Sequence, residues 1–189
     1  GVVTNITASS LRLDAGLAIG SGSEHLQLSV AEVAASALSG GIYLTEADDI
    51  TVTSVEVDTT KVSDTGATSV QTDSALADLR TGNNGQIILV SQGGSITLAD
   101  GDDDGSVVVA DGNGSILIDA NLDVNVNADV ASGDGHIALR AARDLALSSI
   151  DVSTGAGDIS LTASTGMVTM PANAQVTSTT GSVRASGAT

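Results

Sequence analysis

The chain has 189 residues, enough for one domain, and 41% of them are apolar although there is no Trp, no Phe and a single Tyr. A core made almost wholly of aliphatic side chains is narrow and repetitive, which favours a repeat architecture. Six Lys and Arg against 23 Asp and Glu give a net charge of −17, which excludes binding to nucleic acid or to an anionic membrane surface. The chain has no Cys, which excludes disulfides. It also has no apolar run long enough to cross a bilayer, which excludes direct membrane insertion.

The first 62 residues read as divergent β-rich units. Segment 26–38 fits either a helical stripe or two short strands, and both alternatives stay open. The unit that starts at Gly41 continues through apolar alternation at Ile50/Val52, Val55/Val57 and Val62. Residues 63–84 are polar and weakly patterned, so we expect a longer loop there.

The middle of the chain alternates clearly but has no unique phase. Short apolar pairs follow one another at intervals of 9, 11 and 9 residues: Ile87/Leu89, Ile96/Leu98, Val107/Val109 and Ile116/Ile118. This spacing fits either a repeating unit of about 20 residues or one irregular unit of 29 residues from Ile87 to Ile116.

The last third carries the clearest repeat. Units open with Gly, a polar residue and an apolar residue at Gly135, Gly157 and Gly181, so that Ile137, Ile159 and Val183 are equivalent at spacings of 22 and 24. Each unit holds about three short stretches of period-2 alternation separated by turn residues. This pattern predicts an all-β fold, a right-handed, three-sided parallel β-helix with coils of about 20–24 residues. We expect residues 1–189 to form one β-helix segment, with divergent coils over 1–62, the loop over 63–84 and regular coils over 85–189.

Two stretches, Leu13 to Val52 and Gly135 to Met170, resemble units of filamentous-haemagglutinin-like giant exoproteins and adhesins of Gram-negative bacteria. The motifs that carry the resemblance are GGIYL at Gly40–Leu44 and the G-x-I-x-L-x-A units GHIALRA and GDISLTA. The resemblance implies a β-helical fibre that is secreted to the bacterial cell surface and acts in cell adhesion, biofilm or contact between cells. The export signal is then expected outside these residues.

One acidic stretch, Asp100 to Asp111, follows the spacing of a calcium-binding loop. Asp100, Asp102 and Asp104 take its first three ligand positions, Gly105 its turn position and Asp111 its last position. Closely spaced carboxylates in a tight turn supply the hard oxygen ligands that calcium requires. The alternative is a solvated acidic turn, in which Asp and Gly serve the backbone geometry alone. A second, weaker acidic cluster consists of Glu46, Asp48 and Asp49.

No catalytic constellation stands out, so the chain is not expected to be an enzyme: there is no Ser nucleophile elbow, phosphate loop or zinc motif. We expect a structural and adhesive stalk segment. Its partners would be a cell-surface receptor, a polysaccharide or a neighbouring fibre. The alternatives are a specific binding module that recognises a carbohydrate or a protein receptor through loop 63–84 or Tyr43, and a filament subunit that assembles end to end.

Overall fold

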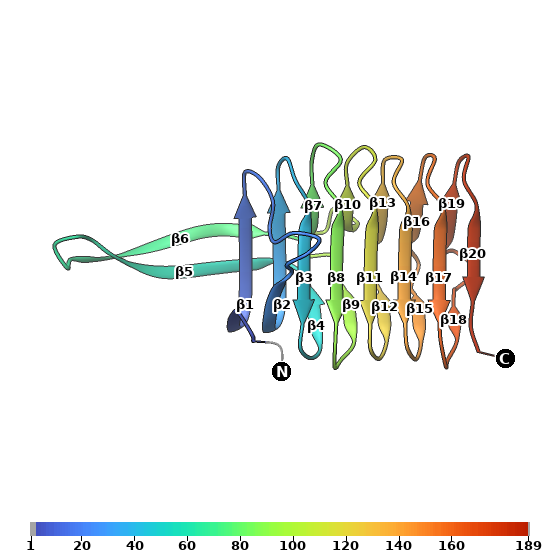
Figure 1. Ribbon diagram of the computed structural model, residues 1–189, viewed down its shortest axis with the longest axis horizontal. Coiled ribbons are helices and arrows are strands. Elements are labelled where there is room, and N and C mark those ends of the chain that lie inside the picture. The colour runs from blue at the N-terminus through green and yellow to red at the C-terminus, as the bar shows by residue number, and fades with distance from the viewer. Residues whose placement is uncertain (1–2, 189) are drawn as a thin grey trace.

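The computed structural model describes residues 3–188, so residues 1, 2 and 189 of the expected 1–189 segment lie outside the described part. The described chain is all β, with no helix, and eighteen of its strands join one sheet whose neighbouring strands pair in parallel. The chain winds in successive turns along the long axis, from β1 at one end to β20 at the other (Figure 1). The described residues therefore form a solenoid-like parallel β-structure.

The first two strands are the longest of the large sheet. They are β1 (Ile6–Ala15) and β2 (Leu26–Ala37), and they pair in parallel along their length. Strand β2 then pairs in turn with β3, β4 and β7, one strand from each of the three stacks that follow. The helical alternative for 26–38 is therefore wrong. Val30, Val33, Ala35 and Ala37 are buried because the extended chain turns them inward, toward the core.

The later turns contribute short strands to three stacks. The first stack contains β3 (Ile42–Glu46), β8 (Ile87–Ser91), β11 (Ile116–Ala120), β14 (Ile137–Ala141), β17 (Ile159–Ala163) and β20 (Val183–Ser186). The second contains β4 (Ile50–Val52), β9 (Ile96–Leu98), β12 (Val124–Val126), β15 (Leu145–Leu147) and β18 (Val168–Thr169). The third contains β7 (Leu79–Thr81), β10 (Ser106–Ala110), β13 (Asp129–Ser132), β16 (Asp151–Thr154) and β19 (Gln175–Ser178).

The core consists of columns of aliphatic side chains that run from turn to turn. Equivalent residues pair in register, which places like on like: Ile42, Ile87, Ile116, Ile137, Ile159 and Val183 in one column, and Leu44, Leu89, Ile118, Leu139, Leu161 and Ala185 in the next. All but Val183 and Ala185, in the last strand, are buried. The predicted equivalence of Ile137, Ile159 and Val183 is confirmed. The interior is filled without aromatic rings because each turn packs only on its neighbours.

A column of glycines explains why each unit opens with this residue. Its members are Gly40, Gly85, Gly114, Gly135, Gly157 and Gly181, and a methyl group added to any of the last five would overlap the carbonyl oxygen of the glycine one turn earlier. Only a residue without Cβ lets the backbones of successive turns approach so closely. The recurring Gly is therefore a requirement of stacking.

Side chains at the corners also tie one turn to the next. Asp49 accepts a hydrogen bond from the backbone N–H of Ser95 (2.7 Å), and Asp144 accepts one from Met167 (2.8 Å). A parallel series runs through the polar residue after each glycine: Asp158 donates its N–H to Nδ1 of His136 (2.9 Å), and Oδ1 of Asp158 accepts from Ser182 (2.7 Å). These bonds satisfy backbone groups that the strand ladders leave free at the corners.

The register decides the phase of the middle region. Ile87 pairs with Ile116, so this turn has 29 residues and the irregular alternative is confirmed, whereas Ile116 to Ile137 takes 21. The expected inward pair Val107/Val109 is wrong in part. A register shift between Ser106 and Val108 lets Val107 and Val108 both be buried, while Val109 turns partly outward.

In place of a single loop over 63–84, the chain forms an antiparallel hairpin that leaves the solenoid. It consists of β5 (Val55–Val62) and β6 (Thr68–Leu76), and it projects past β1 as a long arm (Figure 1). Val62 does not continue the core pattern, because it lies on this arm and is 69% exposed. Nε of Arg12 in β1 donates to the backbone carbonyl of Ser74 in β6 (3.1 Å), which links the root of the arm to the first turn.

Candidate functional site

The two longest connections between the second and third stacks lie one above the other. In one turn the connection between β4 and β7 is the arm, which re-enters at Asp78. In the next turn, seven residues (99–105) separate β9 from β10, where two residues separate β12 from β13. We call residues 99–105 the acidic turn. It packs directly on the root of the arm, because a Cβ on Gly101 would overlap the backbone nitrogen of Ser54.

The carboxylates of the acidic turn shape its backbone. Oδ1 of Asp100 accepts from the N–H of Asp102 (3.1 Å), and its Oδ2 accepts from that of Gly105 (2.8 Å). Asp104 accepts from the N–H of Ser106 (2.8 Å), and Asp102 accepts a longer bond from Asp104 (3.4 Å). Desolvation raises the pKa of Asp100, but the backbone amides of the turn together outweigh it and lower the pKa of this carboxyl. The turn thus favours the ionised form of Asp100.

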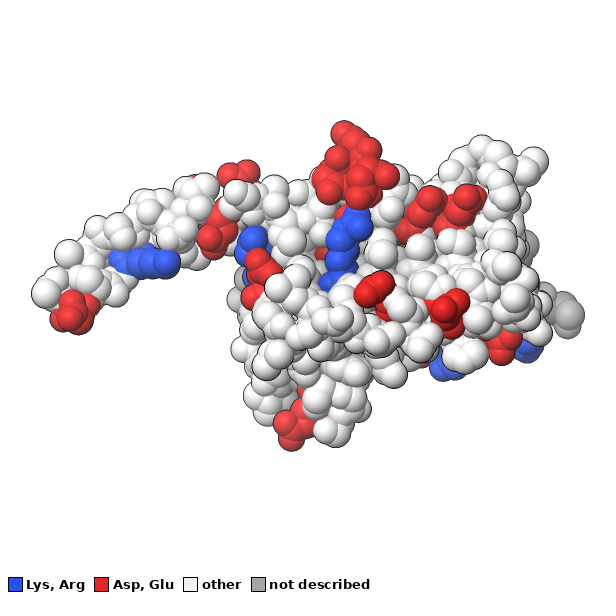
Figure 2. Space-filling model, turned by 90° about the horizontal axis from the view of Figure 1, so that it is seen from above, with Lys and Arg blue, Asp and Glu red and all other residues white. Residues whose placement is uncertain are grey.

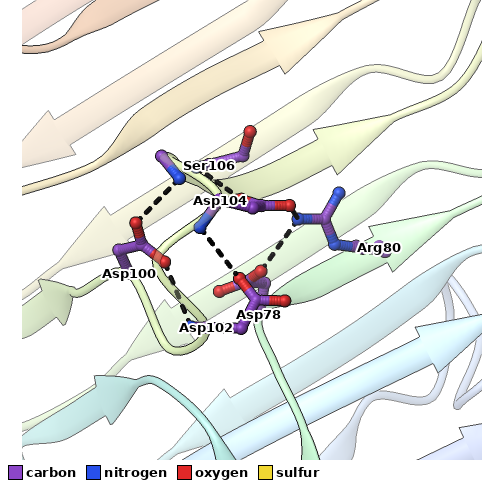
Figure 3. A network of polar contacts seen from close by, with 7 residues as sticks. Asp78, Arg80, Asp100, Asp102, Asp104 and Ser106 are labelled. Atoms are coloured by element: carbon purple, nitrogen blue, oxygen red, sulfur yellow. Dashed lines mark hydrogen bonds and ion pairs between the residues drawn. The ribbon is translucent and has the colours of Figure 1, made fainter.

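Arg80 joins the acidic turn to the strand below it. Its Nη2 donates to Oδ2 of Asp78 (2.9 Å) and to Oδ2 of Asp104 (2.5 Å), as Figure 3 shows. Asp78 is fully buried, whereas the side chain of Asp104 is 43% exposed. Burial raises the pKa of Asp78, and the Arg80 guanidinium opposes that rise. One guanidinium therefore serves two carboxylates.

One carboxylate oxygen of this site has no partner. Among the described residues, Oδ1 of Asp78 is the one buried side-chain oxygen or nitrogen without a hydrogen bond. The Asp78 carboxylate lies beside that of Asp102 (Figure 3), and the charge of Asp102 also raises the pKa of Asp78. A buried carboxylate oxygen without a hydrogen bond is costly, and either a proton or a cation at this position relieves that cost.

The structure brings together three of the four predicted calcium ligands. Asp100, Asp102 and Asp104 lie on one turn, but Asp111 follows the far end of β10 and accepts from the N–H of Asn83 (3.2 Å). Within residues 3–188 one group of three acidic side chains places ligand atoms within 4.8 Å of one another, and it consists of Asp78, Asp100 and Asp102. Sequence reasoning missed Asp78, because it lies 22 residues before Asp100 and is brought there by the stacking of turns.

The weaker acidic cluster serves the fold. Glu46 is fully buried, and its carboxylate accepts from the N–H groups of Val30 (3.1 Å), Ala47 (2.8 Å) and Asp48 (3.4 Å). In the next turn, the residue that pairs with Glu46 in the parallel ladder is Ser91. Glu46 therefore satisfies the Val30 amide, between the parts of β2 that pair with β3 and with β4.

Burial raises the pKa of Glu46 above its ordinary value of 4.5, against the effect of the three amides. The folded protein then binds this proton more tightly than the unfolded chain does. The contribution of Glu46 to stability is fully present below the unfolded pKa and is lost as pH rises through the folded value. We expect the melting temperature of the wild type, minus that of Glu46→Gln, to fall as pH rises from 4 to 7. Glu24→Gln removes an exposed charge and is the control; a difference that grows with pH would contradict this account.

Tyr43, the one aromatic residue, lies half-buried between the inward-facing Ile42 and Leu44. Its ring centroid is 5.9 Å from that of His25, and Nδ1 of His25 lies 2.9 Å from Oγ1 of Thr45. The tyrosine thus faces outward as the alternation predicts, but His25 covers part of its ring.

Comparisons with known proteins add no identification. No protein-family model matches the chain, and neither the curated proteins nor the solved structures searched contain a similar protein. Within residues 3–188 there is also no helix of the length and apolar character that a bilayer crossing requires.

Proposed function

We propose that this chain is a segment of a right-handed, three-sided parallel β-helix that serves as a stiff stalk in a secreted bacterial surface protein. From Ile116 onward the strands of the first stack recur at nearly constant intervals, as in the pairings of Ile116 with Ile137 and of Ile137 with Ile159. Connections between parallel strands of one sheet are right-handed in about 98% of cases, which supports the proposed hand.

The observation that carries the proposal is the unbroken linkage between turns. From β3 to β20 every turn is tied to the next by parallel ladders, an aliphatic column and the glycine column. In such a chain each turn is stabilised only by its neighbours, so stiffness extends along the axis. The lack of cysteine and the net charge of −17 suit a soluble extracellular fibre that cells and neighbouring fibres contact.

The stalk function is tested by pulling on single molecules held at their two ends. A β-helical stalk should resist extension and then lengthen in discrete steps, one for each turn released. A regular turn of 22 residues, such as Ile137 to Ile159, should release about 75 Å of chain. Extension of the whole chain at low force without such steps would contradict the stalk.

A second candidate function is binding through the arm, because β5 and β6 project away from the body and expose Val62 and Val70 (69% and 70%). A receptor, a polysaccharide or a neighbouring fibre would then contact these residues. The two functions separate when residues 56–75 are replaced by a short Gly-Asn turn. If the arm binds, beads coated with the intact chain should attach to cells and beads coated with the shortened chain should not; for a pure stalk the two kinds of bead should attach equally weakly.

A further inference from the structure

We infer that Asp78, Asp100 and Asp102 form a calcium site that fastens the root of the arm to the acidic turn of the next coil. The inference is independent of the stalk function. It differs from the expected loop site in its ligands: a buried carboxylate from the preceding turn of the solenoid joins two from the acidic turn, while Asp104 pairs with Arg80 and Asp111 lies elsewhere.

The unpartnered oxygen of Asp78 is the first argument. Acidic turns are common on protein surfaces, but this one lies over a fully buried carboxylate whose Oδ1 has no hydrogen bond. Arg80 contacts the other oxygen, Oδ2, at 2.9 Å and is shared with Asp104. A cation at Oδ1 would supply the missing partner and would offset the repulsion from Asp102.

The spacing of the oxygens is the second argument. The three ligand atoms lie within 4.8 Å of one another, and an ion at about 2.4 Å from each oxygen bridges pairs up to about 4.8 Å apart. Magnesium usually keeps several waters and binds one or two carboxylates, so a set of three carboxylates suits calcium better. Asp102 is exposed, which leaves room for water as the remaining ligands.

The surface charge is the third argument. Asp102, Asp103 and Asp104 follow one another in the acidic turn and are exposed. Figure 2 shows a compact cluster of acidic side chains next to basic ones on one face of the molecule. The guanidinium of Arg80 pairs with Asp78 and Asp104, whereas Asp100 and Asp102 form no ion pair with a described residue. A divalent cation is attracted to this residual negative charge, whereas an anion or a uronate chain is repelled.

The site lies at the corner of the solenoid between the second and third stacks. The regular turns have short connections at this corner, but here the arm interrupts one turn and the acidic turn lengthens the next. An ion held by Asp78 from below and by Asp100 and Asp102 from above crosslinks the two. Calcium should therefore stabilise the solenoid at the corner where its two longest connections meet.

The test is a calorimetric titration of the whole chain with calcium chloride at constant ionic strength, after metal has been removed with a chelator. We expect saturable uptake of one ion, with a dissociation constant on the order of 10⁻⁴ to 10⁻³ M, and a melting temperature that rises with calcium. Magnesium at the same concentration should bind more weakly. Absence of saturable uptake would overturn the inference.

Two matched variants distinguish binding of calcium at a specific site from nonspecific attraction of calcium to the acidic surface. Asp78→Asn removes the negative charge of the buried ligand and should weaken calcium binding by about tenfold or more. Asp103→Asn removes the same charge from the same corner, outside the three ligands, and should change affinity by less than about threefold. Equal losses in both would show diffuse attraction and overturn the site. If Asp78→Asn fails to fold, the exposed Asp102→Asn carries the test, and unchanged binding in that variant would overturn the inference as well.

Discussion

Substitution of Gly135 by alanine is expected to lower the free energy of unfolding by about 3 kcal/mol. The added methyl group would overlap the carbonyl oxygen of Gly114 and come within 2.8 Å of the backbone nitrogen of Ser115. These are backbone atoms within paired strands and their corners, so they cannot move aside without opening the ladder between β11 and β14. The measurement is urea unfolding followed by circular dichroism.

Gly16→Ala is the matched control, because a Cβ at Gly16 meets nothing within 4 Å and its backbone conformation is open to any residue. That variant should unfold within about 0.5 kcal/mol of the wild type. If Gly135→Ala were as stable as Gly16→Ala, the close approach of successive turns would be contradicted.

Truncation of Leu139 to alanine should destabilise the protein by about 3 kcal/mol. Leu139 has no exposed surface and stacks between Ile118 and Leu161 at the same register position. The shortened side chain leaves a cavity in the aliphatic column, and the glycine column beside it limits how far the turns can close. Chemical unfolding measures the loss, with the cooperativity of the transition as a second readout.

Leu38→Ala removes the same atoms from a side chain that is 66% exposed and should cost less than about 0.5 kcal/mol. Similar losses in the two variants would mean that Leu139 does not lie in a closed core.

The repeat from Gly135 onward could be predicted because its signals are local. Each unit repeats the glycine that stacking requires, followed by apolar residues two and four positions later. This spacing shows from the sequence alone that Ile137 and Ile159 are equivalent. All-β structure with parallel pairing follows from that alternation. The hand of the solenoid does not follow from it, because a reversed winding would bury the same residues.

The phase of the middle region could not be derived from the sequence, because the extra residues of the long turn lie outside the core pattern. The acidic turn adds length between Leu98 and Ser106, and the bulge at Val107 changes which side chains face inward. Apolar spacing alone counts every residue as part of a regular turn. Only the pairing of Ile87 with Ile116 excludes the shorter unit.

The arm escaped prediction because it buries little. Strands β5 and β6 are stabilised by their own antiparallel pairing, and most of their side chains are exposed. The alternation at Val55/Val57 in β5 is the same as that of a core strand, and β6 lacks the alternation that marks a half-buried strand. The polar character of residues 63–84 indicated departure from the solenoid but not the hairpin.

Only those residues of the candidate site that are close together in the sequence could be predicted. The spacing of Asp100, Asp102 and Asp104 pointed to an acidic turn that could hold a cation, and the three do share one turn. Asp78 comes from the preceding turn of the solenoid and joins them through stacking of β7 and β10. A residue brought into a site by register leaves no spacing motif in the chain.

Engineered disulfides test the stacking of turns most directly, since the chain has no cysteine of its own. Ile88 and Leu117 both face partly outward and pair in register, at the separation of about 4.8 Å that a disulfide can bridge. The stacking described here predicts that Ile88→Cys with Leu117→Cys oxidises readily to an intramolecular disulfide and keeps the β-type circular dichroism spectrum. It predicts no disulfide for Ile88→Cys with Val108→Cys, the pair that a shorter turn of about 20 residues would bring together. Crosslinking of the second pair instead of the first would contradict the arrangement.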